Sequence, residues 1–171
     1  MPSFNETFLI FAAAGGLTQI IGANLLIASF GFRNFVVGTA FSKTEVVQAA
    51  AFAWRVLGER VSAWVLLGIG VGVAGVLTLS PGGGKLSTRQ FVDALKQPVT
   101  VYGLSAGAFF ALTAVLVKRA TLALGAANAV EHALLTLAVV MIMQTIMHGA
   151  YVAWREPRTL QRVITTWRVS S

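Results

Sequence analysis

Five apolar stretches, each about 20 residues or longer, dominate this chain and limit what it can fold into. A stretch of that length and composition crosses the hydrocarbon core of a lipid bilayer as a helix. The stretches cover residues 7–30, 35–54, 61–80, 99–121 and 127–154. Because the turns between the first three are only a few residues long, we expect those helices to be antiparallel neighbours. The sequence therefore predicts an all-α, polytopic membrane helix bundle of about five transmembrane helices.

Composition supports a membrane protein and argues against several other classes. Hydrophobic residues make up 56% of the 171 residues and charged residues only 11%, whereas soluble domains carry about 25% charged residues. The net charge of +7 comes from basic residues at the ends of apolar runs, which argues against a nucleic-acid partner. The chain has no cysteine, so neither a disulfide nor a thiolate metal site is expected. The first stretch lacks a basic leader and is too long for a signal peptide, so we expect it to remain as a helix.

Two charged residues, Lys43 and Glu45, lie near the middle of the second stretch. Each costs about 2.5 to 3.5 kcal/mol at mid-membrane on insertion scales, so protein or water must shelter both. In a continuous helix their side chains diverge by about 200° and cannot easily pair with each other. Either Glu45 faces a polar cavity and Lys43 a neighbouring helix, or the reverse holds. The two residues serve either a solute pathway or structural pairing with other groups.

Other polar residues lie inside or at the ends of the apolar stretches. Gln19 and Asn24 lie in the first stretch, where an interhelical hydrogen bond or the lining of a pathway explains them. Glu131 and His132 lie near the start of the fifth stretch, where they are either solvated at the interface or contribute proton-sensitive gating or substrate contact. The candidate residues for a substrate or proton pathway are Glu45, Lys43, Ser42, Gln48, Asn24, Gln19, Glu131 and His132.

Glycines recur every three or four residues in two of the stretches. Gly68, Gly72 and Gly75 form a stripe in the third stretch, and Gly103 and Gly107 begin another in the fourth. Small residues on one face of a membrane helix permit close backbone approach to a neighbouring helix. We therefore expect these glycines to be helix-packing positions.

A polar segment at 81–98 separates two groups of apolar stretches, and it opens with Pro81 followed by three glycines. These residues cannot continue a helix. The segment also lacks the Lys-Ser/Thr pair and the βαβ setting of a phosphate-binding loop. We divide the chain into a three-helix unit at 1–80, a glycine-rich hinge at 81–98, a two-helix unit at 99–154 and a basic amphipathic tail at 155–171.

Part of the chain resembles the EamA-like branch of the drug/metabolite transporter superfamily. The features that carry the resemblance are a helix rich in small residues at 40–53, the turn Leu57-Gly58-Glu59-Arg60, and a glycine-rich helix from Val61 through Gly75. The resemblance covers most of 7–80 and, more loosely, 99–154. It implies two inverted repeats that together hold ten helices, of which this chain lacks the first two and the last three.

The resemblance implies secondary active transport of a small metabolite or drug by alternating access, around a cavity lined by polar residues. It also implies a multi-pass protein of the plasma (inner) membrane, with the lipid bilayer and a small-molecule solute as partners. A homodimer would supply the missing half. The alternatives are a non-transporting membrane scaffold or partner protein and a non-functional truncated transporter.

We expect neither enzymatic activity nor a metal or other cofactor. His132 and His148 lie 16 residues apart in one predicted helix, which is more than four turns, so they cannot share a metal ion. The sequence contains no HExxH motif. Metal-dependent hydrolysis of the kind that this motif supports is therefore not expected.

Overall fold

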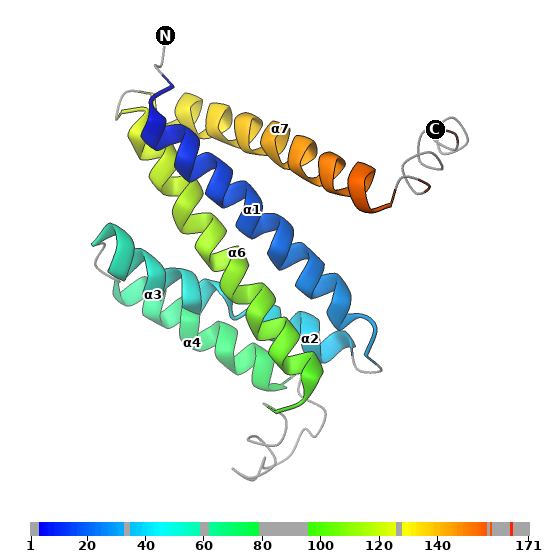
Figure 1. Cartoon of the computed structure of the whole chain (residues 1–171). Coiled ribbons are helices and arrows are strands. Elements are labelled where there is room, and N and C mark those ends of the chain that lie inside the picture. The colour runs from blue at the N-terminus through cyan, green and yellow to red at the C-terminus, as the bar shows by residue number, and fades with distance from the viewer. Residues whose placement is uncertain are drawn as a thin grey trace.

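The computed structural model of the chain shows a bundle of helices (Figure 1). It describes residues 4–32, 35–58, 62–78, 96–125 and 128–156, together with residues 158 and 165. The helices are α1 (Glu6–Ser29), α2 (Phe35–Ser42), α3 (Glu45–Leu57), α4 (Ala63–Thr78), α6 (Pro98–Ala123) and α7 (Ala129–Arg155). No strand occurs in these ranges, so the all-α prediction is confirmed for the part of the chain that is described.

Three helices, α1, α6 and α7, are long and apolar enough to cross a membrane. They correspond to the first, fourth and fifth apolar stretches. The described helix of the third stretch, α4, has 16 residues, fewer than the 20 or so that a span needs. Most of the predicted hinge at 81–98 and most of the predicted tail at 155–171 lie outside the described residues. Membrane-crossing helices are thus supported for three of the five predicted spans.

The second predicted span, 35–54, is not one continuous helix, and the prediction is wrong in this respect. The chain breaks at Lys43 and Thr44 into α2, with 8 residues, and α3, with 13 residues. At the break, the backbone N–H and the hydroxyl of Thr44 both donate to the carbonyl of Phe41, at 3.1 and 2.7 Å. A local turn therefore replaces one turn of regular helix near the middle of the stretch.

The helices α1 and α6 form an antiparallel pair at the centre of the bundle (Figure 1). The Asn5 amide at the start of α1 donates to the carbonyl of Ala123, the last residue of α6, at 2.9 Å. Further along the pair, the hydroxyls of Thr18 and Thr113 are hydrogen-bonded to each other at 2.8 Å in a buried position. The two contacts join the helices both at one end and inside the bundle.

Glycines bring α1 close to both of its long neighbours. A Cβ added at Gly22 would lie 2.9 Å from the ring of Phe110 on α6, and one at Gly16 would lie 3.3 Å from the side chain of Gln144 on α7. A small buried core fills the junction of these three helices and consists of Phe8, Ala12, Ala120 and Val140. The three longest helices therefore pack as one unit at this end of the bundle.

Large apolar side chains outside this core are exposed, such as Trp64 on α4 at 82% and Trp154 on α7 at 79%. Water-soluble monomers rarely expose extended apolar surface, whereas lipid solvates it.

Most hydroxyl groups of the helices have a hydrogen-bond partner within their own helix, because they donate to a carbonyl three or four residues earlier. Those placed to do so are Thr18, Ser29, Ser42, Thr113, Thr121, Thr136 and Thr145. Because a hydroxyl has one proton and Thr18 and Thr113 also bond to each other, only one of these two donates to its own helix.

The break between α2 and α3 rests directly on the glycines of α6. A Cβ added at Gly107 would lie 2.8 Å from the carbonyl oxygen of Ser42 and 3.4 Å from the backbone nitrogen of Glu45. A Cβ added at Gly103 would overlap the backbone of Gly38. Only glycine fits at these two positions unless the backbone of the broken helix moves away.

The glycines of α4 have different surroundings. A Cβ added at Gly68, Gly72 or Gly75 would meet nothing within 4 Å, and α4 packs chiefly against α3 (Figure 1). The close backbone approach that was expected for this stripe is therefore not seen among the residues that the structure describes. The reason is that α3 faces Gly68 and Gly72 across a small cavity and does not pack directly against them.

We predict that Gly107→Ala lowers the free energy of unfolding by roughly 1–3 kcal/mol, because the added methyl group must displace the Ser42 carbonyl. The matched control is Gly70→Ala on α4, where the methyl group would meet nothing within 4 Å and alanine is the better helix former. Unfolding by sodium dodecyl sulfate in mixed micelles, followed by circular dichroism, measures both free energies. Equal effects of the two substitutions would contradict the packing of the break on α6.

Candidate functional site

A cavity of about 650 Å³ lies between α1, α3, α6 and α7. Its polar lining residues are Gln19 from α1, Glu45 from α3, Thr113 from α6 and Gln144 from α7. The remaining lining is apolar and consists of alanine, valine, leucine and methionine side chains together with Phe110. A mostly apolar hollow with a few convergent polar groups is the usual form of a small-molecule site.

The break in the second span brings Glu45 to this cavity. Glu45 is the first residue of α3 and is half-buried. At a helix start, the free backbone N–H groups and the helix dipole stabilise a negative charge. No ion pair or side-chain hydrogen bond joins the Glu45 carboxylate to another residue in the described ranges. The carboxylate is thus available to a solute or to a proton that enters the cavity.

Lys43 lies on a different side of the break. It lines a second, smaller cavity of about 80 Å³ together with Thr44 and with Gly68 and Gly72 of α4. Glu45 therefore lines the large cavity, while Lys43 is exposed and borders the small cavity beside α4. The two side chains were expected to diverge because of the rotation along a continuous helix. In the structure the turn at Thr44 separates them instead.

Gln48 and Ser42 support the break and do not line the large cavity. The Gln48 amide donates to the hydroxyl of Thr44 at 2.9 Å and to the carbonyl of Leu104 on α6 at 3.4 Å. The buried Ser42 hydroxyl donates to the carbonyl of Thr39 at 2.7 Å. Both side chains therefore satisfy polar groups at or next to the interruption, and Gln48 also joins it to α6.

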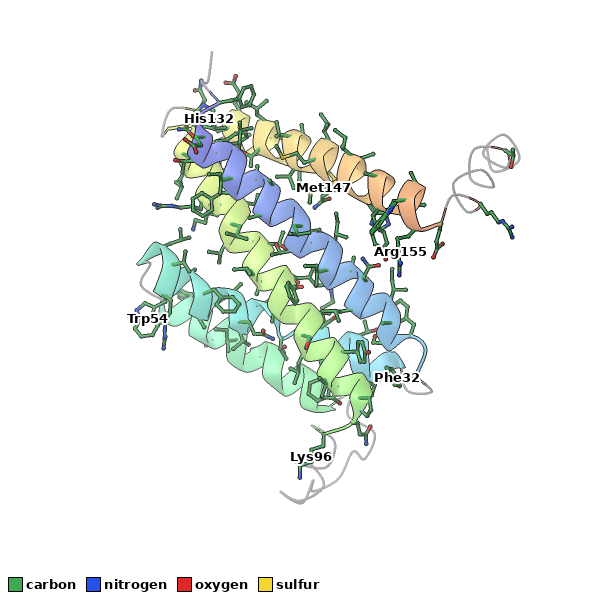
Figure 2. All side chains as sticks on the ribbon, viewed as in Figure 1. Phe32, Trp54, Lys96, His132, Met147 and Arg155 are labelled. Carbon is green, nitrogen blue, oxygen red and sulfur yellow. The ribbon has the colours of Figure 1, made fainter. Side chains whose placement is uncertain are left out.

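The remaining candidate residues lie away from the large cavity. Asn24 is exposed and donates to a carbonyl of its own helix, and Glu131 is exposed and accepts from the Asn128 amide at 3.2 Å. His132 is buried, with its Nδ1 3.0 Å from the carbonyl oxygen of Gly125, so Nδ1 carries the donated proton. Figure 2 shows His132 at the end of the bundle where α7 begins, opposite Phe32 and Lys96. His132 therefore holds the connection between α6 and α7.

The sequence analysis missed two of the polar lining residues, Thr113 and Gln144. Gln144 is an amide inside an apolar stretch, and the criterion that singled out Gln19 would have found it. The sequence does not distinguish Thr113, because threonine is common in membrane helices, where its hydroxyl can bond to a carbonyl of its own helix. The Thr113 hydroxyl lies 2.8 Å from the carbonyl of Phe109 in this way. Only the packing of α1 on α6 shows that Thr113 also lies at a cavity.

Comparisons with known proteins add no further assignment to this geometry. We found no match to the chain among protein-family models, curated proteins or solved structures. The resemblance to EamA-like transporters stays a prediction that rests on the sequence features alone. In the described part of the chain, no group of three or more His, Asp or Glu residues is placed to hold a metal ion. The function is therefore argued from the large cavity and the broken helix.

Because the chain has no cysteine, a single introduced thiol reports on its own surroundings. We predict that Glu45→Cys reacts rapidly with a small, membrane-impermeant methanethiosulfonate reagent, since this position lines the cavity and thiolate formation needs water. Ala12→Cys is the control and is expected to stay unreactive, because Ala12 is fully buried in the core. Labelling rates in membrane vesicles compare the two variants. An unreactive thiol at position 45 would show that the cavity is not hydrated.

Proposed function

We propose that this chain is a membrane transporter subunit that moves a small metabolite or drug by secondary active, alternating-access transport. The observation that carries the proposal is the interrupted helix, whose two halves meet beside the cavity and present Glu45 to it. Irregular backbone at membrane depth is tolerated where it is buried in protein or lines a cavity. Transporters commonly build their substrate sites from such discontinuous helices.

The lining of the cavity supports solute binding. The amides of Gln19 and Gln144 can each donate and accept hydrogen bonds, so they suit many polar solutes. The Glu45 carboxylate adds a titratable group that binds either the solute or a coupling proton. The volume of about 650 Å³ lies within the range of about 300–1,000 Å³ that small-molecule sites occupy. Motion of α3 relative to the packed unit of α1, α6 and α7 would change access to the site.

The proposal includes a multi-pass location in the plasma (inner) membrane and assembly as a homodimer. The exposed apolar side chains of α4, including Trp64 and Leu67, support contact with lipid or with a second copy. A second copy would add helices around the cavity and complete the transporter.

A non-transporting membrane scaffold is the second candidate function. The glycine face of α4 favours it, because Gly68 and Gly72 leave room for the close approach of a helix from another protein. Crosslinking in native membranes separates the two functions. A stable complex with a larger membrane protein, together with no solute flux by the isolated chain, would favour the scaffold.

We predict that Glu45→Gln lowers transport at least about tenfold, because the neutral amide can neither release a proton nor attract a cationic group. The assay is uptake into proteoliposomes of a panel of radiolabelled small metabolites and fluorescent drugs. Glu6→Gln, at the exposed start of α1 and outside the cavity lining, is the matched control and should transport like the wild type. Unchanged uptake by Glu45→Gln would remove Glu45 from the mechanism.

A further inference from the structure

The start of α1 lies beside the end of α6 (Figure 1), and a separate cavity lies there. Its volume is about 260 Å³, and it is lined by Asn5, Thr7, Arg119, Leu122 and Ala123. None of these residues lines the larger cavity. Unlike that cavity, this one has a surface that is more polar than apolar. A ligand here would be held mainly by charge and hydrogen bonds.

Arg119 is the charged group among the residues that line this cavity. Its guanidinium carbon lies 6.0 Å from the centre of the Phe11 ring, a cation–π contact that holds the side chain across the boundary between α6 and α1. In the described ranges no carboxylate pairs with Arg119. The guanidinium fork therefore has donors available, and its geometry matches two oxygens of a phosphate group.

The start of α1 adds further donors beside Arg119. The Asn5 amide is engaged at both ends, since its Oδ1 accepts from the Phe8 N–H at 2.7 Å and its Nδ2 donates to the carbonyl of Ala123 at 2.9 Å, which leaves one amide N–H available. The N–H of Thr7 lies in the first turn, where a helix offers no internal acceptor, and the helix dipole is positive there. Glu6 is exposed and does not line the cavity. The lining is thus suited to a negative ligand.

The depth of this cavity matches that of lipid headgroups. With 26 residues, α6 is about 39 Å long, which exceeds the hydrocarbon thickness of about 30 Å. Arg119 lies in the last turns of α6, at the edge of the hydrocarbon, and long basic side chains at such positions reach the phosphate layer. Leu122 lines the same cavity and is 53% exposed, so it offers apolar surface for an acyl chain.

We propose that this cavity binds a phosphate ester, supplied by the headgroup of an anionic phospholipid, and that Arg119 is its anchor. The phosphate oxygens accept hydrogen bonds from the guanidinium group and from the first turn of α1. The bound lipid then holds the start of α1 against the end of α6 at the membrane surface. A soluble phosphate ester would satisfy the same donors, so the test has to separate the two sources. The proposal is independent of transport through the larger cavity.

The test is native mass spectrometry of the delipidated full-length protein in detergent, titrated with phosphatidylglycerol. The wild type should bind one lipid tightly, and Arg119→Gln should weaken that binding at least about tenfold, because charge-assisted hydrogen bonds to the phosphate are lost. Arg155→Gln is the matched control and should bind like the wild type. Arg155 also lies over an aromatic ring, at 5.9 Å from the centre of Trp154, but it lines none of the three cavities described here.

Two further arms complete the test. Glycerol 3-phosphate that fails to displace the lipid supports the lipid source, whereas displacement at comparable concentration overturns that source and leaves a soluble phosphate ester as the ligand. Arg119→Lys keeps the charge but loses the fork, so it should bind several-fold more weakly than the wild type while circular dichroism shows the same helix content. Binding by Arg119→Gln equal to the wild type, or equal weakening by Arg155→Gln, would overturn the proposal.

Discussion

The contact between the broken helix and the glycines of α6 is the interaction on which the rest of the structure depends. At Gly103 the backbone of α2, and at Gly107 the backbone of the break, lies against the backbone of α6, with no side chain between them. Backbone groups that lack a partner cost several kcal/mol each in lipid, so an interruption inside a membrane would require protein around it. The Gln48 amide supplies part of that protein environment by reaching both the break and α6. The position of Glu45 at the cavity follows directly from this contact.

The charged side chains lie in different parts of the structure. Glu45 lines the large cavity together with uncharged polar residues, while Lys43 lies beside α4. Arg119 lies at the end of the α1–α6 pair, next to the tie between Asn5 and Ala123. One negative group therefore marks the interior, and positive groups lie outside it or toward the membrane surface. This distribution suits an interior site for a solute and a surface site for phosphate.

The sequence predicted the three long helices α1, α6 and α7 because apolar length alone determines them, and it singled out Glu45 and Gln19, which line the large cavity, because polar groups are rare in such stretches. It could not predict the break at Lys43 and Thr44, where neither proline nor glycine interrupts the chain. The break depends on α6, whose Leu104 lies 56 residues from Gln48. The sequence also indicated Asn24 and Gln48 as pathway residues. In the structure the Asn24 amide donates to a carbonyl of α1, and the Gln48 amide donates at the break and to α6. A single sequence does not show which partner satisfies an amide.

The hydroxyls that donate within their own helices change how wet the interior of this protein is. The buried Thr136 hydroxyl donates to the carbonyl of His132 in the preceding turn, so what it presents to its surroundings is a methyl group and an oxygen that can only accept. A hydropathy scale counts such a residue as polar, yet it has no donor left for water or a solute. The interior of the bundle is therefore less polar than the residue types indicate. The charges and dipoles of the remaining amides and carboxylates are screened less as a result.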